Sequence, residues 1–209
     1  MKNSLVSSVC EIGYLGNGRF RPSNVPKCYN IWHQMIRRVH DPKTSVHLRN
    51  YHDVVIDPIW YNFQNFAEWY YYQIDHFGPV TFHWNLDKDL LFPMNRKYGP
   101  DVCCLIPQHL NKVFNDYSFG QGQLPLGVIQ HGRLYKVRVS DFGKRKYLGL
   151  YKTVHDAQIA YWTVKFEVIR NTTIQYWQYL PEPLAFRLLC FGWEDAIAYY
   201  GDKARLWSN

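Results

Sequence analysis

The clearest alternation of apolar and polar positions lies in the second half of the chain. Within residues 133–140, Tyr135, Val137 and Val139 fall on one face of a predicted strand, because side chains alternate along an extended backbone. The other face is polar and basic. A glycine-containing turn follows, and a second strand is predicted over residues 145–151. The pattern therefore predicts a hairpin with one apolar and one cationic face.

The hairpin is followed by a segment with helical spacing. Thr153 is a good N-cap, and Asp156 stands three residues later, as in a capping box. Ala157, Ala160 and Tyr161 begin an apolar stripe that continues to about residue 169. The two alanines on this stripe allow the predicted helix to lie close to the sheet.

Apolar spacing in the first half of the chain predicts two helices and a small mixed segment. The first helix covers residues 30–40. The second begins at Asp57, which can cap it, and at Pro58, which suits a first turn. Its aromatic stripe is interpreted as core rather than as a platform for stacking bases. Residues 82–111 then follow the order strand, loop, strand and short helix.

Charge is distributed in blocks along the chain, which carries a net +7. Residues 1–50 hold eight Lys/Arg against two acids, and residues 127–170 hold nine against three. Residues 51–126 hold four against eight. The basic blocks suit contact with phosphates, whose strength falls with salt. The acidic middle suits metal-binding carboxylates or a solvated surface.

The composition limits the class of protein. A content of 47% hydrophobic and 18% aromatic residues argues against disorder. No apolar run approaches the ~20 residues that span a bilayer, and the N-terminus is too polar for a signal peptide. Five cysteines without a CxxC pair favour reduced thiols in the cytoplasm, with no zinc site and no disulfide framework. No motif indicates a nucleotide cofactor. Because no apolar run is long enough to span a bilayer, we expect no membrane partner.

Residues 127–161, about a fifth of the chain, resemble the DNA-binding domain of plant ethylene-response factors, which also occurs in phage and mobile-element proteins. The resemblance is carried by Gly127-Val128, Tyr135, the triplet Tyr147-Leu148-Gly149, Thr153 and the helix of Ala157, Ala160 and Tyr161. It implies a first strand over residues 127–131, completing a three-stranded antiparallel sheet that packs on one helix and lies in the major groove of double-stranded DNA. Isoleucine stands at position 129, where the family has an arginine. The positions that match the family's DNA contacts are Ile129, His131, Lys136, Arg138, Arg145 and Tyr147. Further duplex contacts are expected from Arg37, Arg38 and Arg133.

Residues 82–111 resemble the HNH, or ββα-metal, nuclease motif. Asp87, at the end of the first strand, matches the motif's Asp, while Asn95 matches its loop asparagine and Asn111 its helix residue. The resemblance implies that Asp87 and Asn111 bind Mg²⁺ or Mn²⁺, and Asp89, which projects to the same face of the strand as Asp87, could share the ion. The wider frame over residues 29–170 resembles phage HNH-type, homing-endonuclease-like proteins with an ethylene-response-factor-like tail. The wider resemblance is carried by Tyr29–Arg38, the aromatic residues Trp60, Phe63, Phe66 and Trp69, Leu86–Asp89, Tyr98–Cys103 and Asn111.

One residue departs from this motif. Lys88 stands where an HNH nuclease has its general-base histidine, and a lysine ammonium holds its proton at neutral pH. His83 and His109 are candidate replacements, so the candidate catalytic residues are Asp87, Lys88, His83 and His109. The alternative is that Asp87, Lys88 and Asp89 form a salt-bridged turn in a motif that has lost its chemistry. A buried Lys88–Asp89 ion pair would favour that alternative.

The sequence thus predicts an α+β protein in four segments: an irregular segment 1–28, a helical and ββα-metal-like domain 29–120, the sheet-and-helix domain 125–170, and a helical extension 171–209. Three functions stay open. The first is a phage-type, metal-dependent, site-specific DNA endonuclease acting in the bacterial cytoplasm. The second is a non-catalytic DNA-binding regulator. The third is an inhibitor that binds a host protein through the aromatic C-terminal segment, whose Trp193, Tyr199, Tyr200 and Trp207 could instead close the core.

Overall fold

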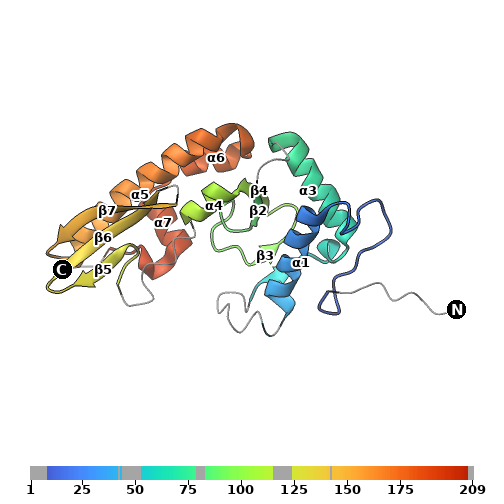
Figure 1. Cartoon of the computed structure of the whole chain (residues 1–209), viewed down its shortest axis with the longest axis horizontal. Helices are drawn as coiled ribbons and strands as arrows, with labels where there is room; N and C mark the ends of the chain where they lie inside the picture. The colour runs from blue at the N-terminus through green and yellow to red at the C-terminus, as the bar shows by residue number, and fades with distance from the viewer. Residues whose placement is uncertain are drawn as a thin grey trace. The chain divides into compact units, whose positions relative to one another are not determined.

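The chain divides into two compact units, Met1–Leu105 and Ile106–Asn209 (Figure 1). The computed structural model describes residues 9–41, 43, 53–78, 83–114, 124–141 and 143–206. The predicted α+β class is confirmed. The second unit contains both the sheet-and-helix domain and the helical extension expected from the sequence. It also contains the short helix that the sequence placed at the end of the 29–120 domain.

The first unit combines helices with two small two-stranded sheets. Strands β1 and β3 pair in parallel, and strands β2 and β4 form the second sheet. The first two residues of β4 close this unit and its last two open the next. Its elements are α1 (Pro26–His40), β1 (Val55–Ile56), the 3₁₀ helix η2 (Pro58–Tyr61), α3 (Phe63–Phe77), β2 (Trp84–Asp87), β3 (Lys97–Tyr98) and β4 (Cys104–Pro107).

The single helix predicted from Asp57 onward is wrong in one respect, because the segment forms two helices. Asp57 caps as expected, since its Oδ1 accepts a hydrogen bond from the Ile59 N–H at 3.1 Å. Only the short η2 follows, and Asn62 then leaves the helical conformation, with φ −82° and ψ 116°. Its Oδ1 accepts from the Gln64 N–H at 3.0 Å and starts α3. A second capping residue therefore divides the stripe.

The aromatic stripe of this segment forms the core of the first unit, as predicted. Trp60 is 1% exposed and Phe63 is fully buried. The Trp32 indole, from α1, donates to the Trp60 carbonyl at 2.7 Å, and the ring of Trp60 lies 5.1 Å from that of Phe66. The indole hydrogen bond satisfies the one polar group that such a ring brings into the core.

The second unit is built around one antiparallel sheet and one long helix. Strands β5, β6 and β7 lie in that order, and the sheet packs on α5, which confirms the predicted arrangement. The elements are α4 (Gln108–Phe114), β5 (Val128–His131), β6 (Leu134–Asp141), β7 (Lys144–Tyr151), α5 (Val154–Tyr176), η3 (Trp177–Tyr179), α6 (Glu182–Leu189), α7 (Trp193–Tyr200) and η4 (Gly201–Lys203).

Helix α5 begins as predicted and runs seven residues beyond its predicted end at residue 169. Thr153 Oγ1 accepts from the Asp156 N–H at 3.0 Å and donates to its carboxylate at 2.8 Å. The added turns contain Thr172 and Thr173, which are fully buried and donate to the carbonyls four residues before them. Packing against α6 stabilises these turns although threonine has a modest helix propensity.

The sheet and α5 meet at a close-packed apolar layer. Val137 and Val139 of β6 are 0% and 1% exposed, and Tyr161 of α5 is 2% exposed. Gly127 precedes β5 with φ +72°, and a Cβ there would lie 2.0 Å from the Tyr161 ring and 2.8 Å from the Arg138 carbonyl oxygen. Only glycine fits this position, for both conformation and space.

The aromatic residues of the C-terminal helices pack within the second unit. Trp193 and Tyr200 lie 5.9 Å and 5.4 Å from the Trp162 ring of α5, measured between ring centroids. Tyr199 lies 5.4 Å from Phe114 of α4. Of the two readings of the aromatic segment, the structure thus supports closure of the core for these three residues. Trp207 lies outside the described residues.

Besides the two threonines, Lys165 and Gln158 of α5 are fully buried and bond to backbone carbonyls. Lys165 donates from Nζ to the carbonyl of Val113 at the end of α4. Gln158 donates from Nε2 to the carbonyls of Ala204 and Arg205, at 3.2 Å and 2.6 Å. These bonds tie α4 and the C-terminal turn to α5.

Candidate functional site

The strand register determines which side chains share the solvent face of the sheet. Lys136 of β6 pairs with Ile129 of β5 on one side and with Leu150 of β7 on the other. Further along β6, Arg138 pairs with Tyr147. Residues directly opposite each other in neighbouring strands point to the same face. These five side chains therefore lie on the face away from Val137 and α5.

A β-bulge in β7 gives this face its composition. Val137 pairs with Gly149, whereas Arg138 pairs with Tyr147, so Leu148 is an extra residue without a counterpart in β6. In a regular ladder Arg138 would pair with Leu148, and Tyr147 would lie opposite Val139 and face the helix, since a one-residue shift exchanges the two faces of a strand. Gly149 takes φ +130°, which side-chain-bearing residues rarely adopt.

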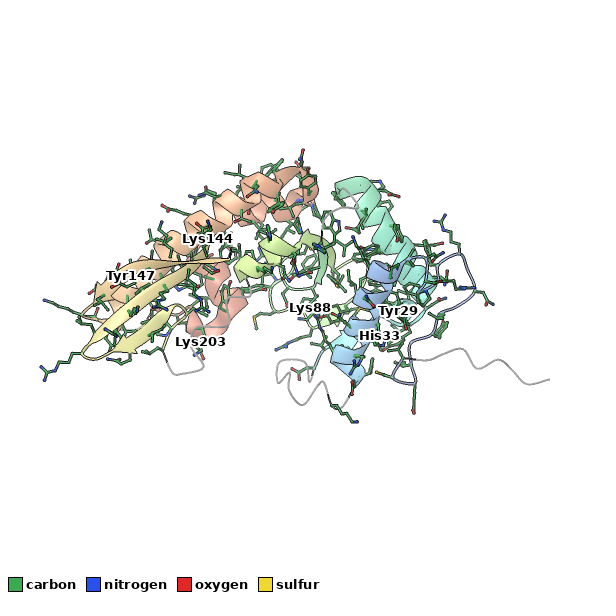
Figure 2. The ribbon with its side chains drawn as sticks, viewed as in Figure 1. Tyr29, His33, Lys88, Lys144, Tyr147 and Lys203 are labelled. Atoms are coloured by element: carbon green, nitrogen blue, oxygen red, sulfur yellow. The ribbon has the colours of Figure 1, made fainter. Side chains whose placement is uncertain are left out.

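We call the resulting surface the outer face. Its cations are Lys136, Arg138 and Arg145, and it has no acidic residue. The ring of Tyr147 and the aliphatic side chain of Leu150 are open to solvent, at 55% and 43% exposed. The Lys136 ammonium lies 5.6 Å from the centroid of the Tyr147 ring, within the range of a cation–π interaction. Figure 2 shows Tyr147 on β7. The outer face consists of Ile129, His131, Leu134, Lys136, Arg138, Ser140, Arg145, Tyr147 and Leu150.

The outer face contains all six positions that the sequence resemblance selected. They come from three strands and the register brings them together. Arg133 lies apart, exposed in the turn between β5 and β6. Sequence reasoning missed Leu150, because strict alternation from Arg145 places position 150 on the opposite face. The Leu-Gly-Leu sequence was the available signal, since glycine inside a strand often marks a bulge.

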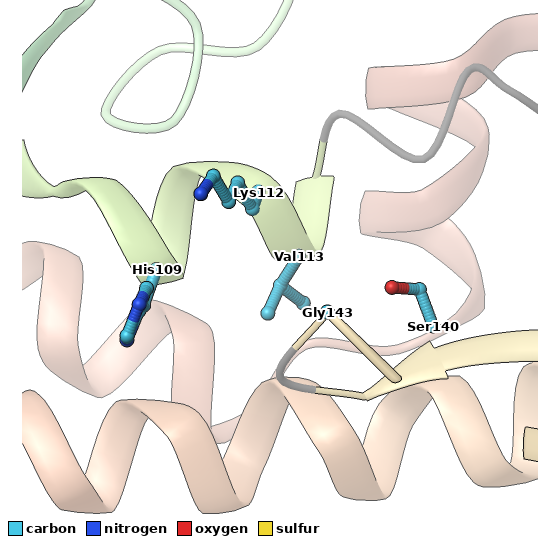
Figure 3. Close-up of a pocket in the computed structure, with 5 residues that line it drawn as sticks. All are labelled: His109, Lys112, Val113, Ser140 and Gly143. Atoms are coloured by element: carbon cyan, nitrogen blue, oxygen red, sulfur yellow. The ribbon is translucent and has the colours of Figure 1, made fainter. Parts of the chain in front are cut away.

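A small hollow of about 50 Å³ lies at the tip of the β6–β7 hairpin beside α4, lined by His109, Lys112, Val113, Ser140 and Gly143 (Figure 3). Its polar groups do not converge, since Lys112 points away from Ser140. His109 is exposed, and its Nδ1 lies 3.0 Å from the Tyr176 hydroxyl of α5. This candidate base is therefore held by a residue of the second unit.

Asp87 and Lys88 are the central residues of the candidate nuclease site in the first unit. Asp87 ends β2, and its Oδ1 accepts hydrogen bonds from the N–H groups of Asp89 and Leu90 at 2.9 Å and 2.7 Å. Burial raises the pKa of the Asp87 carboxyl to about 6, although these two bonds act in the opposite direction. The carboxyl thus stabilises the turn that follows the strand.

Lys88 is buried, with 7% of its surface exposed, and it is held on two sides. Its Nζ lies 2.6 Å from Asp89 Oδ1 and donates to the Asn95 carbonyl at 2.9 Å. The Asn95 amide donates back to the Lys88 carbonyl at 2.8 Å and to that of Lys97 at 2.7 Å. Figure 2 labels Lys88 in this loop. Lys88 and Asp89 thus belong to a salt-bridged turn, the arrangement that the sequence offered as the alternative to a catalytic site.

The other predicted site residues are spread over both units. Asn111 is on α4 in the second unit, whereas Asp87 and Asp89 belong to the first. His83 is exposed immediately before β2. Within the described ranges, no three His, Cys, Asp or Glu side chains are grouped so that they could hold a metal ion. Arg37 and Arg38 lie in the last turn of α1, where Arg37 pairs with Asp41 at 2.8 Å.

Comparisons with protein-family models, curated proteins and solved structures give no match to this chain. All five cysteines are unbridged. No helix among the described residues has the length and apolar character needed to cross a bilayer.

Proposed function

We propose that this protein binds double-stranded DNA by placing the outer face in the major groove, and that it acts as a non-catalytic regulator in the cytoplasm. The observation that carries the proposal is the bulge-dependent register, which brings three cations, an exposed tyrosine and a histidine onto one face of a rigid sheet. The free thiols agree with a reducing compartment.

The dimensions and chemistry of the outer face suit this role. The major groove is ~12 Å wide and admits a two-stranded ribbon. Strands β6 and β7 have eight residues each. Arg138 and Arg145 can donate in pairs to guanine O6 and N7 or to phosphates, and Lys136 adds a third cation. The sheet is held from behind by α5, so the strand backbones that carry these side chains need little ordering on binding.

The non-catalytic part of the proposal is supported by the bonds around Lys88. Its ammonium is engaged by the Asp89 carboxylate and the Asn95 carbonyl, and Asp87 holds two backbone N–H groups. A general base needs to accept a proton from water, and an ion-paired ammonium has no lone pair with which to do so.

A metal-dependent endonuclease is the second candidate function. It is favoured by one observation, which is that β2 pairs with β4 and that α4 follows β4 directly in the chain, in the order of the ββα motif. In that case Asp87, Asp89 and Asn111 would hold Mg²⁺ or Mn²⁺, and His83 or His109 would take the place of the missing base.

Binding and cleavage can be tested with the full chain and a pool of random duplexes. We expect Arg145→Ala to weaken binding roughly tenfold, from the loss of one bidentate contact. Lys146→Ala is the matched control, because Lys146 has the same charge on the same strand but pairs with Val139 and belongs to the other face. Equal effects of the two substitutions would reject the outer face as the interface.

The same preparations distinguish the two candidate functions. We expect no cutting or nicking with Mg²⁺ or Mn²⁺. Cleavage that disappears in Asp87→Asn, with DNA affinity unchanged, would replace the regulator with the endonuclease.

A further inference from the structure

One cation of the outer face, Lys136, has an apolar side chain beside it on each neighbouring strand. Ile129 on β5 and Leu150 on β7 flank Lys136 in one row of paired residues, and Leu150 is 43% exposed. A single exposed leucine is ordinary on a protein surface. Here two aliphatic side chains flank Lys136 in one row, with Leu134 in the row on one side and the half-exposed Tyr147 ring in the row on the other. Such side chains contribute nothing to attraction for phosphates.

The major groove offers one apolar group to a protein, the C5-methyl of thymine. Apart from small C–H groups such as cytosine C5–H, the other groups on the base edges there are hydrogen-bond donors or acceptors, which an aliphatic side chain cannot satisfy. Covering a donor or acceptor with Ile129 or Leu150 would leave it without water and without a partner, at a cost in free energy. Contact with a methyl group removes apolar surface from water on both sides.

We infer that Ile129 and Leu150 read thymine methyl groups, so that the target of this protein contains thymines beneath the centre of the sheet. The inference rests on the proposed binding of DNA through the outer face. The arginine that the resembling family has at position 129 would donate to guanine, whereas isoleucine selects for the methyl. Lys136, held over the Tyr147 ring, sets a cation between the two apolar contacts.

The bulge makes this arrangement specific to the register of the sheet. Leu150 shares the face of Tyr147 only because Leu148 has no partner in β6, where Arg138 pairs with Tyr147 and Val137 pairs with Gly149. The two apolar contacts therefore come from the outer strands, and the cations come from the central strand and from the hairpin end of β7. A target site is expected to have thymines on either side of a position contacted by Lys136.

The test uses the full-length protein and the best duplex selected from a random library. Each thymine is replaced in turn by deoxyuridine, which removes the methyl and keeps the Watson–Crick edge. We expect roughly fourfold weaker binding at one or more positions, the value of one buried methyl. Ile129→Ala or Leu150→Ala should abolish the preference for thymine at its own position. Ile159→Ala is the matched control, because Ile159 is an exposed isoleucine on α5 and should keep every preference.

Each outcome is informative. Tight binding by the wild-type protein with no loss at any deoxyuridine would overturn this inference and leave the proposed function intact. Retention of the same preferences in both variants would do the same. Failure of the wild-type protein to bind any duplex would overturn both. The deoxyuridine scan of the wild-type protein needs no variant, so the inference is tested even when a substitution prevents folding.

Discussion

Replacing Lys88 by methionine tests whether the Asp-Lys-Asp turn is structural. Methionine keeps most of the buried stem and removes the ammonium, so the cavity term is small. The lost bonds are those to Asp89 Oδ1 at 2.6 Å and to the Asn95 carbonyl at 2.9 Å. Hydrogen bonds to charged groups are worth about 1.5–3 kcal/mol each. Asp89 is one-third exposed and can regain water, so we expect a net loss of about 2 kcal/mol.

Urea unfolding, with hydrogen exchange localised to residues 84–98, measures this loss. Lys97→Met is the matched control, since Lys97 forms an ion pair with Asp57 at 2.7 Å while nearly half of its side chain is exposed. We expect a much smaller effect there, because water and salt screen exposed pairs. DNA affinity should be unchanged in both variants. Equal stability of Lys88→Met and the wild-type protein would refute the structural role of this lysine.

Three further predictions follow from the geometry. Gly127→Ala should destabilise the second unit by about 3 kcal/mol, because the new Cβ meets the Tyr161 ring. Gly149→Ala has its nearest contact at 3.6 Å and should cost about 1–2 kcal/mol through its φ of +130° alone. Thermal unfolding that reverses this order would contradict the packing. The folded-state pKa of Asp87 is raised to about 6, so the Asp87 carboxyl binds a proton more tightly in the native protein than in the unfolded chain. Stability should therefore fall as the pH rises from about 4 to 6. Unfolding followed across this range should show no such fall in Asp87→Asn. Finally, Arg133 and Lys136, with Arg138 and Arg145 wherever these do not bind guanine, make two to four phosphate contacts, so log affinity should fall with log salt with a slope of about −2 to −4. The slope is measured by titration at several salt concentrations, and a slope near zero would argue against a DNA interface.

The sequence was sufficient for the elements whose signals are local. Alternation in β6 and the Thr153 cap of α5 depend on neighbouring residues, and both are found where predicted. The early end predicted for α5 was wrong because its last turns depend on tertiary packing against α6. The division of the Asp57 segment also escaped prediction, because Asn62 is an equally good cap within an unbroken aromatic stripe.

The candidate sites differ in the same way. The cationic face of β6 follows from alternation, but the addition of Leu150 depends on a bulge that only the pairing with a neighbouring strand defines. At Lys88, the sequence posed two alternatives and could not choose, since the choice depends on whether the ammonium reaches Asp89 and the Asn95 carbonyl seven residues away. Contacts across a loop are a property of the folded chain.

Lys165 and Gln158 of α5 limit how the outer face could be moved between proteins. A fragment containing only residues 125–170 would retain every residue of the outer face. It would also take Lys165 away from the Val113 carbonyl and Gln158 away from the carbonyls of Ala204 and Arg205. The fragment would also lack α4 and α6, against which α5 packs, so apolar surface of α5 that the whole unit buries would be exposed to water. The sheet and α5 therefore cannot be transferred alone, and a recombinant protein that keeps the outer face intact must also include α4 and the C-terminal turn.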